Sequence, residues 1–100
     1  MAYAVIHHFP GGTQAQYEAV LAVVHPAGVL PDGQTHHAAG PSAGGWTIIA
    51  RHESAASWEK FRDGTLLPAM ASGIDGGFTV PPVETAFEVV AETLTSPTQV

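Results

Sequence analysis

Residues 37–61 constrain the fold more than any other stretch, because they place two strands and a helix in direct succession. A segment of strand character ends in a Pro/Gly-rich turn, and a second strand follows over residues 46–53. Ser54 then supplies an N-cap, with Trp58 and Phe61 four and seven residues beyond it on one helical face. Strands this close in sequence pair antiparallel, so the centre of the domain is predicted to be a hairpin followed by a helix.

The flanking segments complete a βαββαβ order of elements. The expected strands cover residues 2–9, 34–39, 46–53 and 84–94, and the expected helices cover 13–25 and 54–72. Thr13 and Gln16 have the spacing of a capping box, whereas Gly64 and Pro68 are expected to weaken or kink the second helix.

This order predicts an α+β, ferredoxin-like fold with a four-stranded antiparallel sheet. Short connections and right-handed crossovers place the third strand between the first and second, and the fourth strand outside the first. Both helices then cover one face of the sheet. We expect one domain over residues 1–95 and a frayed tail over 96–100.

The composition narrows the choice of partners. A net charge of −6 with only three cationic side chains leaves nothing to neutralise a phosphate backbone, so no nucleic acid is expected. The sequence has no apolar run long enough to span a membrane and no signal peptide pattern, so a cytoplasmic protein is expected by default. The absence of cysteine excludes disulfides and thiolate chemistry. Apolar residues make up 45% of the chain against 12% charged, which favours a second buried surface covered by a second copy of the chain.

Six histidines are the unusual feature of the composition, and their spacing bears on metal binding. His7 and His8 are neighbours on a strand and point to opposite faces, and the same holds for His36 and His37. Neither pair can chelate as a unit, and His52 is expected at the far end of the sheet from His7. No metal site is therefore predicted.

The hairpin alignment decides which side chains lie together. If Gly40 lies opposite Trp46, then His36, Trp46 and His52 share one face and His37 lies on the other. A one-residue shift exchanges these partners, and the sequence does not tell which face meets the helices.

Several of these motifs together resemble a known family, the dimeric α/β-barrel superfamily that includes the antibiotic biosynthesis monooxygenase-like proteins. The matching segments are His37-Ala38-Ala39-Gly40-Pro41, Gly45-Trp46, Glu53-Ser54, the aromatic pair Trp58 and Phe61, and Phe9-Pro10-Gly11-Gly12-Thr13, the last of which is similar to small bacterial members. The chain departs from the monooxygenase branch at Ala50 and His52, where that branch tends to carry an acidic residue and an aromatic one.

The resemblance implies a homodimer whose two sheets form a barrel, with a small pocket between each sheet and its helices. In better-known relatives such pockets bind flat aromatic polyketides, quinols or, in some branches, haem. No flavin or nicotinamide motif is present, and no cofactor is expected.

The candidate catalytic residue is His37, because a histidine in an apolar pocket can accept a proton from an acidic phenol or enol, and because His37 lies in the matching stretch. The candidate substrate-binding residues are His7, His36, Trp46, His52 and Trp58. Each also fits a purely structural place in the sheet or core, Trp58 above all because it shares a helical face with Phe61.

We therefore expect a small-molecule enzyme that acts on small aromatic or enolic compounds through a histidine base, as a cofactor-independent monooxygenase or isomerase. One alternative is a non-catalytic dimer that binds a hydrophobic ligand or haem. Another is a structural, stress-related dimer with no ligand.

Overall fold

Four strands form one antiparallel sheet in residues 1–93, the part of the chain that the computed structural model describes. The strands are β1 (Tyr3–Pro10), β2 (Gln34–Ser42), β3 (Gly45–His52) and β4 (Val83–Glu88). Their order across the sheet is β2-β3-β1-β4. This order and the βαββαβ arrangement confirm the predicted ferredoxin-like, α+β fold.

The predicted helix caps are present. Helix α1 (Gln14–Val24) begins with the Thr13 capping box, in which the Gln16 amide donates to Thr13 Oγ1 and the Thr13 amide donates to Gln16 Oε1. A short 3-10 turn, η1 (Pro26–Gly28), follows it. Helix α2 (Ala55–Phe61) begins at Ser54, whose hydroxyl accepts the Ser57 amide.

The second helical segment changes its winding where Gly64 and Pro68 occur, as expected. A π-helical turn, η2 (Arg62–Leu66), joins α2 to α3 (Leu67–Ser72). Pro68 lies in the first turn of α3, where its missing amide hydrogen leaves no gap in the hydrogen bonding. Gly73, with a positive φ, ends the helix.

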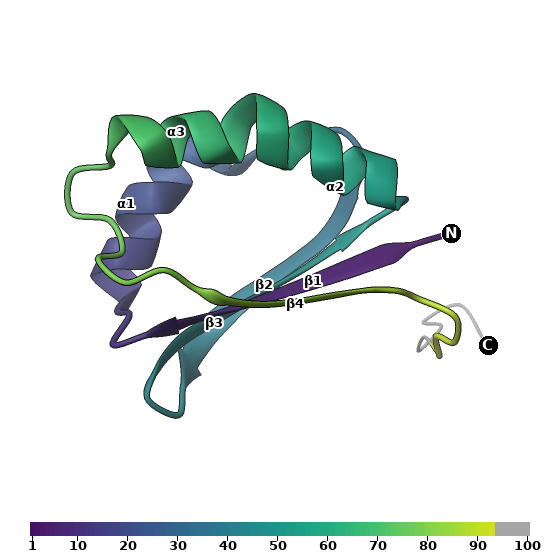
Figure 1. Ribbon diagram of the computed structural model, residues 1–100, viewed down its shortest axis with the longest axis horizontal. Coiled ribbons are helices and arrows are strands. Elements are labelled where there is room, and N and C mark those ends of the chain that lie inside the picture. Colours follow the sequence, from purple (N-terminus) through teal and green to yellow (C-terminus); the bar gives the residue numbers. More distant parts are fainter. Residues whose placement is uncertain (94–100) are drawn as a thin grey trace.

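All the helices lie on one side of the sheet, and the opposite side carries no layer of its own among the described residues (Figure 1). The buried core between the sheet and the helices consists of Val5, Val20, Val24, Trp58 and Phe61. The opposite face, which we call the outer face, leaves Ile49, Val83 and Phe87 about half exposed or more. Within residues 1–93 the sheet is therefore covered on one face only.

The hairpin alignment differs from the one considered above. Pro41, not Gly40, lies opposite Trp46, because β2 continues to Ser42 and the turn is only two residues long. Gly44 in that turn has φ +77°, which suits glycine. The pairing of Gly40 with Trp46 was therefore wrong. As a result, His37 and Trp46 both lie on the side of the sheet that faces the helices, which we call the inner face.

Strand β4 ends at Glu88, six residues before the predicted end. Its partner β1 starts at Tyr3, which pairs with Glu88, and the Val89 amide makes one more hydrogen bond to the Ala2 carbonyl. Strand β4 ends there because its partner strand β1 begins at Tyr3 and offers no further residues for pairing. Leu94 and the predicted tail 96–100 lie outside the described residues. Within those residues, no helix has the length and apolar character needed to cross a membrane.

Candidate active site

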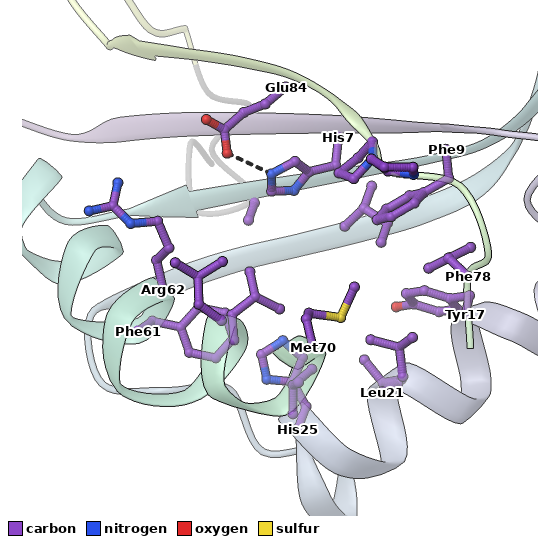
Figure 2. Close-up of a pocket in the computed structure, with 18 of the residues that line it drawn as sticks. His7, Phe9, Tyr17, Leu21, His25, Phe61, Arg62, Met70, Phe78 and Glu84 are labelled. Atoms are coloured by element: carbon purple, nitrogen blue, oxygen red, sulfur yellow. Dashed lines mark hydrogen bonds and ion pairs between the residues drawn. The ribbon is translucent and has the colours of Figure 1, made fainter. Parts of the chain in front are cut away.

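A cavity of about 440 Å³ lies between the inner face of the sheet and the helices (Figure 2). This volume is within the range of small-molecule pockets. Most of its walls are apolar, with contributions from β1, α1, α2, α3 and the loop before β4; they include Phe9, Val20, Leu21, Phe61, Met70 and Phe78. Phe78, in the loop before β4, stacks on Phe9 of β1 at 3.7 Å between ring centroids, and this contact holds the loop against the sheet.

A tyrosine and a histidine form a hydrogen-bonded pair in the cavity wall. Tyr17 lies on the first turns of α1, His37 lies on β2, and the Tyr17 hydroxyl is 2.7 Å from His37 Nε2. Burial raises the pKa of Tyr17 and lowers the pKa of His37. Both groups are therefore neutral near pH 7, and the tautomer of His37 decides which of the two atoms donates.

A second buried histidine adjoins this pair. His25, just after α1, meets His37 edge-on at 5.2 Å and stacks on Phe61 at 5.3 Å between ring centroids. Burial, and next the nearby His37, lower the pKa of His25. Its Nδ1 atom is buried and has no hydrogen-bond partner among the described residues. The His25 imidazole is therefore neutral near pH 7, as is that of His37 beside it.

Polar groups also occur at the opposite end of the cavity. His7 Nε2 lies 2.8 Å from a Glu84 carboxylate oxygen, and Arg62 lines the same region from the π-helical turn (Figure 2). Trp58 packs against His7 at 5.6 Å between ring centroids. The cavity thus has an apolar middle and hydrogen-bonding groups at both ends.

Three of the predicted site residues line the cavity and three do not. His7, His37 and Trp58 line it. Trp46 and His52 lie on the same inner face but below the cavity wall: Tyr17 covers Trp46 at 5.3 Å between ring centroids, and His52 is 0% exposed beneath Trp58.

His36 lies away from the cavity altogether. It is opposite Arg51 on the outer face of the sheet, where its side chain is exposed. The expectation that His36 contacts a substrate in the cavity is corrected for this reason: the hairpin register exchanges His36 and His37 between the faces.

Sequence reasoning did not select Tyr17, His25, Gln34, Arg62 or Glu84, although all five line the cavity. From the sequence, Tyr17 fits the apolar stripe that it forms with Val20, Leu21 and Val24 at helical spacing. The available signal was a tyrosine in that stripe, whose hydroxyl needs a partner when buried. For Glu84 there was no such signal, because its contact with His7 depends on the pairing of β4 with β1.

Among the residues that the structure describes, no group of three or more histidine, aspartate or glutamate side chains could hold a metal ion. What the Tyr17–His37 pair can do chemically is move a proton. A hydroxyl group in the cavity can donate to the Tyr17 oxygen while the tyrosine proton passes to His37 Nε2.

The sequence matches no protein-family model, and a search of curated proteins finds no significant match. Solved structures are similar in fold. Rv0793 from Mycobacterium tuberculosis superimposes with a TM-score of 0.70 at 20% identity, over 94% of this chain and 100% of that one.

Two further solved structures share the fold. A candidate antibiotic biosynthesis monooxygenase from Bordetella bronchiseptica gives a TM-score of 0.63 at 18% identity, over 90% of this chain and 98% of its own. A monooxygenase from the ActVA-Orf6 gene of Streptomyces coelicolor, solved with the ligand nanaomycin D, gives 0.58 at 19% identity, over 95% and 92%. At these identities the shared property is the fold, and the fold expected from the resemblance to antibiotic biosynthesis monooxygenase-like proteins is confirmed.

Proposed function

We propose that this protein is a small-molecule enzyme that removes a proton from a phenolic or enolisable aromatic compound, with His37 as the base. The single observation that carries the proposal is the 2.7 Å contact between the Tyr17 hydroxyl and His37 Nε2 in the wall of an apolar cavity. An imidazole that burial keeps neutral near pH 7 can accept a proton at that pH.

The proposed step moves two protons. The substrate donates its acidic proton, from a hydroxyl group or from an acidic C–H group, to the Tyr17 oxygen, and the Tyr17 proton passes to His37 Nε2. The products are a substrate anion, a neutral tyrosine and an imidazolium. Tyr17 lies between the imidazolium and the new anion, and in a cavity of mostly apolar walls the attraction between these opposite charges is stronger than in water.

The anion then has two fates, which define two reaction types. In a cofactor-independent monooxygenase, dioxygen is the co-reactant: the electron-rich carbon of the anion reduces it, one oxygen atom enters the product and the other leaves as water. In an isomerase, the imidazolium returns the proton to a different atom of the same anion, and no co-reactant is needed. The S. coelicolor neighbour, a monooxygenase solved with nanaomycin D, supports the first type.

The dimensions and polarity of the cavity narrow the substrate class. An apolar middle with aromatic walls suits a flat compound of two or three rings. Polar groups at both ends, Tyr17 with His37 at one and His7 with Arg62 at the other, suit a compound with oxygen substituents at opposite ends. We propose such a compound as the substrate.

Anthrone, an enolisable three-ring ketone, is a suitable probe. Under anaerobic conditions in D₂O, the protein is expected to speed the exchange of the acidic CH₂ protons, which reports the base alone; in air, oxygen uptake and formation of anthraquinone report oxygenation. A His37→Gln variant should lose exchange by about a hundredfold or more, in line with the usual contribution of a general base. Tyr17→Phe should also lose most of it, because the phenol links the substrate to the base.

His36→Gln is the matched control, because it makes the same change one residue away on the outer face. It should leave the exchange rate unchanged. Quenching of tryptophan fluorescence measures binding separately. Binding of anthrone without any exchange beyond that of His37→Gln would favour the alternative of a non-catalytic hydrophobic-ligand protein and would contradict the proposed enzyme.

We also propose that a second copy of the chain covers the outer face. Ile49 on β3 and Val83 and Phe87 on β4 lie there, each 47–62% exposed, on the two strands that flank β1. An apolar sheet face of this kind is usually covered in a stable protein, and a homodimer covers it with the fewest assumptions. The oligomeric state in solution tests this proposal, and a charged substitution on the outer face should change it.

A further inference from the structure

The hydrogen bonds of His37 continue away from the cavity into the protein. His37 Nδ1 lies 3.0 Å from Gln34 Oε1, and Gln34 Nε2 lies 3.2 Å from His52 Nε2. His52 Nδ1 lies 2.9 Å from Ser57 Oγ, and the Ser57 hydroxyl donates to the Asp32 carbonyl at 3.2 Å. Side chains from β2, β3 and α2 thus form one chain of hydrogen bonds that begins at Tyr17.

A β-bulge makes this chain possible. Gln34 pairs with His52 and His36 pairs with Arg51, so Thr35 is an extra residue in β2. In a regular strand, residues three apart point to opposite faces, and Gln34 and His37 could not meet. The extra residue brings both of them to the inner face, which is a known use of bulges beside functional sites.

These hydrogen bonds have one consistent direction of donation, which is set at the Ser57 end. The Ser57 hydroxyl has one hydrogen and gives it to the Asp32 carbonyl, so Ser57 Oγ accepts from His52 and His52 Nδ1 carries a hydrogen. His52 is fully buried, and burial lowers its pKa, so it is neutral and its Nε2 accepts from the Gln34 amide nitrogen. The Gln34 oxygen is left to accept from His37 Nδ1.

This direction fixes the state of the base. With its hydrogen on Nδ1, neutral His37 presents a free electron pair at Nε2, and the Tyr17 hydroxyl donates to it. The opposite tautomer would present a hydrogen to Tyr17 and could not take its proton.

We propose that Gln34, His52 and Ser57 are positioning residues that hold His37 in its Nδ1–H tautomer, with Nε2 ready to accept a proton through Tyr17. This inference rests on the proposed function for its purpose, but its content is a property of the free protein. His52 and Ser57 are not among the residues that line the cavity, so these two act on His37 through Gln34.

The packing around the chain supports this role. His52 is 0% exposed and Gln34 is 8% exposed, so bulk water does not compete for their hydrogen bonds. Gly33 has φ +86°, and a Cβ at this position would collide with the Ser57 hydroxyl. A glycine here therefore leaves room for the serine that ends the chain.

Nitrogen-15 NMR of histidine-labelled protein tests the inference without any substrate. At about pH 8, above the ordinary histidine pKa of about 6.5, long-range proton–nitrogen spectra distinguish the two neutral tautomers. His37 and His52 are both expected as Nδ1–H, the tautomer that free imidazole disfavours in water. An Nε2–H spectrum for His37 in the unmodified protein would overturn the proposal.

Two variants at Gln34 test its part in the chain. Gln34→Met removes the acceptor with little change of volume, so His37 should shift to Nε2–H, and anthrone exchange should fall by at least about tenfold, as is known for a base held in the wrong tautomer. Gln34→Glu keeps an oxygen acceptor and should keep His37 as Nδ1–H, with a raised pKa because of the added carboxylate. An unchanged His37 tautomer in Gln34→Met would contradict the inference.

Ser57→Ala tests the remote end. Without the serine, nothing sets the direction of donation, so the Nε2–H form of His37 should appear together with that of His52, whereas Ser57→Thr should preserve both spectra. Failure of the proposed function would give a separate result. If His37→Gln leaves anthrone exchange unchanged while these tautomers are as expected, the hydrogen-bond chain exists but His37 is not the base.

Discussion

The two faces of the sheet carry similar residues in very different surroundings. Each adjacent histidine pair is divided between them: His7 and His37 point to the inner face, and His8 and His36 to the outer one. On the inner face the histidines meet Glu84, Tyr17 and Gln34 in the wall of the cavity. On the outer face they bond to nearby hydroxyl groups of Thr47 and Thr35.

The comparison teaches that burial, not residue type, separates a candidate base from a surface histidine. Strand alternation distributes these side chains evenly between the faces. The helices then remove water from one face only, and the loss of water is what lowers the pKa of His37. The outer face, with its exposed apolar groups, has no such cover within the described residues (Figure 1).

The largest expected effect comes from one substitution made on each side. Phe61→Ala removes a ring that is 8% exposed under the helices and should lower the free energy of unfolding by about 3–5 kcal/mol. Phe87→Ala removes a ring that is 47% exposed on the outer face and should cost about 1 kcal/mol or less for the single chain. Urea denaturation at low protein concentration measures both. Equal losses would break the distinction between the faces.

A charge on the outer face is expected to act on self-association. Ile49→Lys should weaken the proposed dimer by about a hundredfold, or ~2.7 kcal/mol, because the ammonium group loses water without a partner. Val23→Lys, on α1, is the matched control, since Val23 and Ile49 are both 48% exposed. Sedimentation velocity over a range of concentrations measures the change. Equal behaviour of the two variants, or a monomer at every concentration, would refute the outer-face interface.

The smallest expected effect is a loss of stability in mild acid. His25, His37 and His52 have pKa values below the ordinary value of 6.5, mainly through burial. The unfolded chain therefore binds protons at a higher pH than the folded one. Stability should be full above about pH 6.5 and fall as the pH drops from there towards the folded-state pKa values. Urea midpoints between about pH 8 and pH 5 check this window.

Two histidine variants sharpen the pH experiment. His25→Phe removes one buried imidazole with an unpartnered Nδ1 and keeps the stacking on Phe61, so it should flatten the decline in acid. His36→Gln, on the exposed outer face, should leave the decline as it is. The comparison fails if His36→Gln flattens the curve as much as His25→Phe does.

Much of the fold could be predicted because its signals are local. The Thr13 capping box, the Ser54 cap and the break at Gly64 depend on neighbouring residues alone, and the strand order follows from short connections. The end of β4 could not be predicted in this way. It depends on where β1 begins, and the two strands are about eighty residues apart in sequence.

The candidate site was only partly accessible from the sequence. His37 and Trp58 were found because a histidine base and a helical aromatic stripe have recognisable patterns, and both line the cavity. His36 was placed in the wrong environment, because a shift of one residue in a hairpin moves every side chain to the other face.

The sequence by itself determined the order of the elements and their caps. It also determined that one histidine of each adjacent pair points to one face of the sheet and the other histidine to the opposite face. Only the tertiary structure decided which direction leads to the cavity and which partners each histidine meets. There are two physical reasons. The two-residue turn aligns Pro41 with Trp46 and so directs His37 to the inner face, and the extra residue Thr35 places Gln34 on that same face, where it can bond to both His37 and His52. Such a change of register leaves no mark in local propensity, because it is stabilised by contacts between strands and not within one.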